Sequence, residues 1–255
     1  MPPVTSQART GPVTPSANFL LIALIFASIG FAIGVGALEG TGAGFVFVVT
    51  GFVLGLCLHE FGHAFVARRL GDTGMPTTGY LTIDPRHFTD PVATLVLPVL
   101  YTILGGIGLP GGSAPVDRDR VSGKARQAIV AAAGPAMSVA ILAVLAGLYG
   151  LTGTGAKPLS AVLAVSALFQ CTALIVNLVP IPGLDGYGMI SPWFPDAWRS
   201  VGDRIARHAG LILTASFLLC EVVGRPLLRI SLPMTALLGF APDDVVAGYQ
   251  LIRLW

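Results

Sequence analysis

The sequence predicts an all-α polytopic membrane protein. Of its 255 residues, 54% are hydrophobic and only 11% are charged, whereas soluble domains carry about 25% charged residues. The hydrophobic residues gather in runs of the length that a helix needs to cross a bilayer. We therefore expect about five to six transmembrane helices, together with a re-entrant segment and a short β-strand near the cytoplasmic face. The lipid bilayer is the expected partner, and a net charge of +2 is too small to indicate nucleic acid.

The first part of the chain predicts a tail and an antiparallel helix pair. Residues 1–18 are rich in Pro, Ser and Thr and predict a flexible tail. The uncharged run 19–38 predicts the first membrane helix. A glycine-rich turn follows, so the second helix, 45–67, runs back and ends at Arg68-Arg69. Because positive residues favour the cytoplasmic side, we expect the N-terminus and the end of the second helix inside.

The middle of the chain predicts two less regular elements. Residues 79–84 contain the sequence Tyr-Leu-Thr-Ile and predict a short strand. Residues 92–109 are apolar enough to cross a membrane, but they contain one proline and three glycines. Broken backbone of this kind is typical of a re-entrant segment, which we expect here.

The rest of the chain predicts further helices. Long apolar runs cover 127–150 and 159–179, and a shorter run covers 208–224. Prolines interrupt the remainder, which we expect to be membrane-associated without assigning a crossing. The predicted division is a tail at 1–18, a membrane domain at 19–224 with its core at 45–188, and a C-terminal membrane-associated segment at 225–255.

The pattern His59-Glu60-x-x-His63 lies near the inner end of the second helix. Residues four apart on a helix share one face, so both imidazoles can reach one ion. Zinc accepts imidazole nitrogen and keeps a position for water when three protein ligands bind it. Glu60 can then take a proton from that water, as in metal-assisted hydrolysis. The alternative is a pair of structural histidines, but ionisable residues at membrane depth are costly and indicate function.

Asp185 is the best candidate for a third ligand. Pro180 and Pro182 remove backbone donors and end the apolar run before it. Broken backbone at membrane depth is tolerated where it lines a cavity, and Asp185 follows the break. On these residues alone, an ordinary surface turn explains Asp185 equally well.

Three stretches in this order, HEFGH, AAAGPAMS and NLVPIPGLDG, resemble the site-2 protease family of intramembrane zinc metalloproteases. The stretches LTIDPRHFTDPVATLVLPVL and APVDRDR further resemble its compact prokaryotic branch, which lacks a PDZ domain. The resemblance implies that Asn177 donates a hydrogen bond to the oxyanion or to the substrate backbone. It also implies that Glu60 is the general base and that the Zn²⁺ ligands are His59, His63 and Asp185.

The resemblance, which covers about residues 55–188, also implies an activity and a location. We expect a zinc-dependent metalloendopeptidase that hydrolyses peptide bonds within or near transmembrane segments. Its expected substrates are single-spanning regulators, such as membrane-tethered transcription regulators or anti-sigma factors. The expected location is the cell membrane, with several crossings and with the active site toward the cytoplasmic face. The sequence indicates no particular oligomeric state.

Two positions differ from the family pattern. The asparagine that follows Gly134-Pro135 in the family falls at Ser138, which keeps a hydroxyl but loses the reach of an amide. Its role therefore stays open. His87 lies in a loop where relatives often have a histidine, but its register is offset by one, so we expect a solvated loop residue.

The metal hypothesis sets a condition on topology. Asp185 must lie at the depth of His59, so 159–179 must run in the same direction as the second helix, and 127–150 must run in the opposite direction. Residues 92–109 must then begin and end on the inner side. The positive residues flanking that segment also fall inside, as the positive-inside rule requires; they are Arg86, Arg118, Arg120, Lys124 and Arg126.

Two alternatives use the same histidines. One is a membrane-anchored zinc protease with a cytoplasmic catalytic domain and a glutamate as third ligand, but no polar segment is long enough for such a domain. The other is a metal carrier or metal-sensing scaffold. Glu60 distinguishes them, because a carrier needs only the ligands, whereas a protease also needs the base.

Overall fold

Four long apolar helices dominate the computed structural model, which describes residues 13–72, 80–87, 120–152, 157–206, 208 and 221–253. The four helices, each long and apolar enough to cross a membrane, are α1 (Ala17–Gly34), α2 (Thr41–Arg69), α4 (Lys124–Thr152) and α5 (Pro158–Asn177). They coincide with four of the predicted runs and confirm an all-α membrane protein. The predicted re-entrant segment 92–109, and most of the predicted run 208–224, lie outside the described residues.

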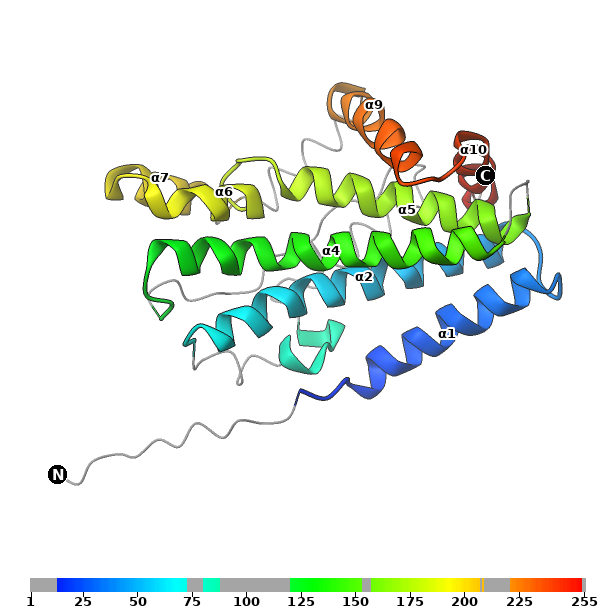
Figure 1. Cartoon of the computed structure of the whole chain (residues 1–255), viewed down its shortest axis with the longest axis horizontal. Coiled ribbons are helices and arrows are strands. Elements are labelled where there is room, and N and C mark those ends of the chain that lie inside the picture. The colour runs from blue at the N-terminus through cyan, green and yellow to red at the C-terminus, as the bar shows by residue number, and fades with distance from the viewer. Residues whose placement is uncertain are drawn as a thin grey trace.

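Helix α5 is the centre of the bundle and α1 is at its edge. In the most apolar window of α5, 89% of the residues are buried, against 6% in α1. Figure 1 shows α2, α4 and α5 side by side, with α9 (Glu221–Leu237) and α10 (Pro242–Ile252) on the other side of α5. Gly248 of α10 contacts the backbone carbonyl of Ala161, an approach that a Cβ would prevent. Helix α1 therefore leaves several large apolar side chains exposed, among them Leu20, Leu24 and Phe31.

Local signals in the sequence set the limits of these helices. Ser16 caps α1, because its hydroxyl accepts a hydrogen bond from the backbone N–H of Phe19 at 3.1 Å. The reversal between α1 and α2 uses Gly36 and Gly40, whose φ angles of +71° and +96° favour glycine. Pro158 opens α5 at a position where the missing N–H costs nothing.

The predicted strand at 79–84 is wrong for the residues that the structure describes. Tyr80–Thr82 forms a 3₁₀-helix, and Ile83 turns the chain with a φ of +54°. Leu81 and Ile83 are buried with α2 residues in one apolar cluster. Packing against α2 therefore overrides the β propensity of this short stretch.

The end of this same segment is tied to the beginning of α1. The backbone N–H of Ser16 donates to the carbonyl of Thr82 at 2.8 Å. The Asn18 amide donates to the Asp84 carboxylate at 3.0 Å. These contacts fix the start of α1 next to the region where α2 ends.

The long connection between α2 and α4 begins and ends at the same end of the bundle. Asp72 Oδ1, just after α2, lies 3.9 Å from Arg120 Nη1, just before α4. Helices α2 and α5 run in the same direction, and α4 runs against both (Figure 1). The condition on topology that the metal hypothesis sets is thus met by these three helices.

Candidate metal centre

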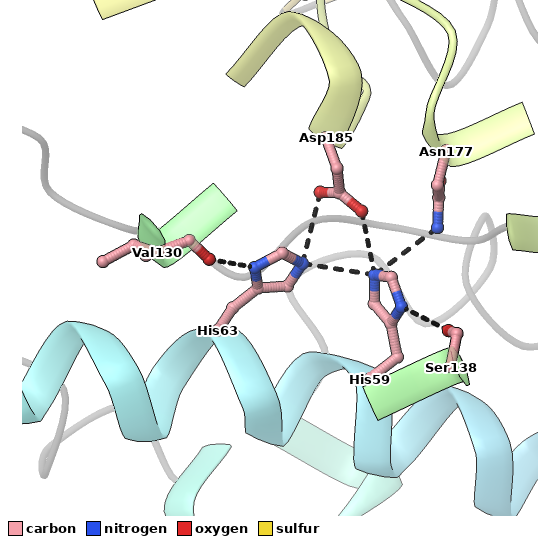
Figure 2. Close-up of polar contacts among 6 residues, drawn as sticks. All are labelled: His59, His63, Val130, Ser138, Asn177 and Asp185. Carbon is pink, nitrogen blue, oxygen red and sulfur yellow. Dashed lines mark hydrogen bonds and ion pairs between the residues drawn. The ribbon is translucent and has the colours of Figure 1, made fainter. Parts of the chain in front are cut away.

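The predicted ligands lie together at one end of the bundle. His59 Nε2 is 3.0 Å from Asp185 Oδ2, and His63 Nε2 is 3.2 Å from Asp185 Oδ1. The two Nε2 atoms are 3.2 Å apart (Figure 2). Among the described residues, these three form the one group of His, Cys, Asp or Glu that could hold a metal ion, with ligand atoms within 4.8 Å of one another.

Each imidazole is oriented by a contact to α4 through its other nitrogen. His63 Nδ1 lies 2.8 Å from the carbonyl of Val130, and His59 Nδ1 lies 2.9 Å from Ser138 Oγ. A carbonyl can only accept, so we assign the proton of His63 to Nδ1, which leaves its Nε2 lone pair facing Asp185. The Ser138 hydroxyl can donate or accept, so its contact holds the His59 ring in place without fixing the tautomer. Such contacts hold metal-binding histidines in place.

The chain reaches Asp185 through a compact turn after α5. Gly183 has a φ of +100°, a conformation that favours glycine. Asp185 then opens the short helix α6 (Asp185–Ile190). A Cβ at Gly186 would overlap the carbonyl of Leu178, so glycine lets α6 fold closely against the end of α5. The sequence Pro-Gly-Leu-Asp-Gly thus builds a turn that returns one carboxylate to the two imidazoles.

Gly134 of α4 keeps the space beside the ligand atoms open. A Cβ at this position would overlap Nε2 of His63 and would lie 2.6 Å from Nε2 of His59. Two imidazole nitrogens and a carboxylate are a zinc ligand set that leaves a fourth position for water. The donor chemistry and the space at Gly134 therefore both fit a zinc ion.

Asp185 offers both of its carboxylate oxygens to the two imidazoles. An anionic carboxylate is the form that binds a metal cation.

The two remaining predicted residues also lie at the cluster. Glu60 follows His59 on α2 and is 2% exposed. Asn177 is the last residue of α5, and its Nδ2 lies 3.4 Å from His59 Nε2 with the amide pointing at the cluster (Figure 2). All five residues singled out from the sequence are therefore brought to one end of the bundle.

Two contributions from α4 were not assigned from the sequence. Ser138 contacts His59, and Gly134 leaves space beside the ligand atoms. Val130, Gly134 and Ser138 are spaced four apart, so the sequence could have placed them on one face of the helix. Of His87, the structure gives the backbone, at the end of the 3₁₀-helix Pro85–His87, and its side chain lies outside the description.

Fold and site together define a membrane metalloprotein of the H-E-x-x-H type. Rip2 of Mycolicibacterium smegmatis, named as a zinc metalloprotease, is 39% identical over 253 residues and aligns over 95% of both chains. Rip2 of Mycobacterium tuberculosis is 38% identical over 216 residues, which cover 83% of this chain and 81% of the relative. YwhC of Bacillus subtilis, also named as a zinc metalloprotease, is 29% identical over 67% of this chain and 80% of its own length.

The chain belongs to the site-2 protease family of zinc metalloproteases. No protein-family model matches the chain. No solved structure matches it significantly. Membership of this family makes zinc the cofactor that the cluster of His59, His63 and Asp185 is suited to hold.

Proposed function

We propose that the protein is an intramembrane endopeptidase that hydrolyses peptide bonds within or near transmembrane segments of other membrane proteins. The observation that carries this proposal is the position of the cluster. His59 and His63 are 4% exposed and lie within α2, a helix long enough to cross a membrane. Ionisable residues at that depth indicate a functional site.

The residues at the cluster would divide the reaction among them. His59, His63 and Asp185 would hold the zinc ion, which when bound supplies a Lewis acid that activates water and polarises a peptide carbonyl. Glu60 would accept the proton of the attacking water and pass it to the leaving amine. The Asn177 amide would donate a hydrogen bond to the oxygen on which negative charge develops.

The same proposal includes the place of the enzyme in the cell. Arg68 and Arg69 end α2 next to the cluster, which supports an active site toward the cytoplasmic face of the cell membrane and a cytoplasmic N-terminus. Residues 19–224 would form the metalloprotease domain around the core 45–188. Single-spanning regulators of the membrane are the proposed substrates.

A comparison of wild-type enzyme with Glu60→Gln tests the proposal. Membrane fragments from cells that express each form would be quantified by proteomics, and zinc would be measured in each purified protein. We expect fragments cut within transmembrane segments from the wild type and a reduction of about 10²–10⁴-fold in Glu60→Gln, with zinc retained. Asp196→Asn is the matched control, because it makes the same change from acid to amide at an exposed residue that begins α7 (Asp196–Ala206).

Each contrary result has its own meaning. Full proteolysis by Glu60→Gln would exclude Glu60 as the base. Zinc transport that continues in Glu60→Gln, without any proteolysis by the wild type, would favour the carrier. Retention of both zinc and activity by Asp185→Ala would exclude Asp185 as the third ligand.

A further inference from the structure

A narrow cavity beside the cluster continues into a larger apolar one. The narrow cavity is lined by His59, Ser138 and Asn177 among others. The larger cavity, of about 300 Å³, lies between α1, α2, α4 and α5 and is almost wholly apolar. Both are lined by Phe52 and Gln170. The apolar space is thus continuous with the space next to the metal ligands.

A third cavity extends this space toward the opposite end of the bundle. It measures about 700 Å³, shares Phe26 and Leu148 with the second cavity, and ends at Glu39 and Lys157. We call the second and third cavities together the α1/α4 groove. Its lining follows α4 from Met137 to Thr152, which at 1.5 Å per residue is about 22 Å. That length is most of the hydrocarbon core of a bilayer, about 30 Å.

The groove opens toward lipid. Val144 and Leu148 form part of its α4 side, and their exposed fractions are 62% and 42%. The other side is α1, where only 6% of the residues in the most apolar window are buried. An occupant would therefore come from the hydrocarbon region of the membrane.

One amide interrupts the apolar lining close to the cluster. Gln170 is 5% exposed and lies on α5 seven residues, or about two turns, before Asn177. Its side chain packs against Gly55, where an added Cβ would lie 2.8 Å from Gln170 Oε1. Within the part of the chain that the structure describes, no other group hydrogen-bonds this amide. The amide is a polar group in an almost wholly apolar lining, and it offers a hydrogen-bond donor and an acceptor to an occupant of the groove.

We propose that the α1/α4 groove holds the transmembrane segment of the substrate and that the Gln170 amide hydrogen-bonds its backbone where the segment unwinds toward His59. This inference rests on the proposed function. The length, the apolar lining and the opening toward lipid fit a transmembrane helix. The amide fits the peptide groups that such a helix frees when it becomes extended, and a lipid acyl chain has no group that would use it.

Two tryptophan variants on α4 test the groove. Val144 lines it and Val139 does not, although both are valines of one helix with exposed fractions of 62% and 55%. We expect Val144→Trp to lower cleavage of a single-spanning substrate about 10²-fold by displacing its backbone from the cluster. Its zinc content, and its cleavage of a short water-soluble peptide with the same cleavage sequence, should equal those of the wild type. Val139→Trp should behave as the wild type with both substrates.

The amide is tested separately. Gln170→Leu should lower kcat for the single-spanning substrate about tenfold through one lost hydrogen bond, with zinc unchanged. Gln170→Asn, which keeps an amide, should recover part of that loss. Wild-type activity in Gln170→Leu would overturn the role of the Gln170 amide. Equal loss of cleavage in Val144→Trp and Val139→Trp would overturn the groove as the binding site.

Occupancy of the groove is measured without catalysis. A photo-crosslinking residue at position 144 of the Glu60→Gln enzyme should capture the substrate's transmembrane segment, whereas capture of lipid alone would overturn the proposal. If the wild type cleaves neither the membrane substrate nor the peptide, the proposed function fails. The crosslink still reports independently on the groove.

Discussion

Ser138 on α4 lies 2.9 Å from Nδ1 of His59 on α2, and both side chains are buried. The serine stands where the family pattern has an asparagine, and its hydroxyl alone is enough to reach the ring. His63 has its equivalent contact from the carbonyl of Val130, which no substitution of a side chain removes. The two imidazoles therefore differ in how easily they can be released from their orientation.

The substitution Ser138→Ala should weaken zinc binding about 10–100-fold, because His59 loses the partner that holds the direction of its ring. Zinc affinity would be measured by competition with a chelator of known affinity. Ser160→Ala is the matched control, a buried serine of α5 whose hydroxyl bonds the carbonyl of Lys157. Equal affinities in all three proteins would show that Ser138 does not position His59.

The substitution Gly134→Ala should abolish zinc binding. Its methyl group would overlap Nε2 of both histidines and fill the space beside the ligand atoms. Gly147→Ala on the same helix has no atom within 4 Å of the added methyl, and it should stabilise the helix by about 1 kcal/mol. Zinc content after purification distinguishes the two variants, and full zinc in Gly134→Ala would contradict the geometry described for the cluster.

The substitution Asn177→Ala should lower kcat about 10²–10³-fold while zinc content stays unchanged. The reason is that Asn177 faces the cluster with a donor and is not one of the three residues that could hold the ion. Single-turnover cleavage of a peptide substrate would give the rate of the chemical step. An unchanged rate would assign Asn177 a structural role at the end of α5.

The substitution Tyr149→Phe should destabilise the fold by about 1–3 kcal/mol without changing zinc affinity. The Tyr149 hydroxyl donates to Asp244 Oδ2 at 2.5 Å and accepts from the backbone N–H of Ala241 at 3.1 Å. The variant leaves Asp244, which is 4% exposed, without this donor. A lower Tm in detergent with unchanged zinc affinity is the expected result, and an unchanged Tm would contradict it.

The four long helices, and the shared helix face of His59 and His63, could be predicted because their signals are local. Each helix is a continuous apolar run, and His59 and His63 share a helix face by their spacing alone. The relative directions of α2, α4 and α5 followed from one condition, that Asp185 must reach His59. The structure satisfies it with a contact of 3.0 Å.

The rest depends on contacts between distant segments. Residues 80–83 read as a strand because short apolar runs have no diagnostic period, and burial of Leu81 and Ile83 against α2 decides their conformation. The role of Ser138 required knowing which face of α4 meets α2. Gln170 was one polar residue in an apolar run, and its position in the groove appears only once α2 and α5 are packed together.

Helix α4 makes polar contacts to other helices in two places. Val130 and Ser138, in its first half, contact the histidines, and Tyr149, near its other end, bonds Asp244. Helix α1 is hydrogen-bonded at its start, while its middle packs through the stacked rings of Phe26 and Phe47. Apolar contacts have no preferred direction, and lipid tails are as apolar as the side chains. Separating such contacts inside a bilayer therefore costs little free energy. Binding of a substrate helix as proposed would therefore separate α1 from the later part of α4, while the contacts of Val130 and Ser138 to the histidines stay in place.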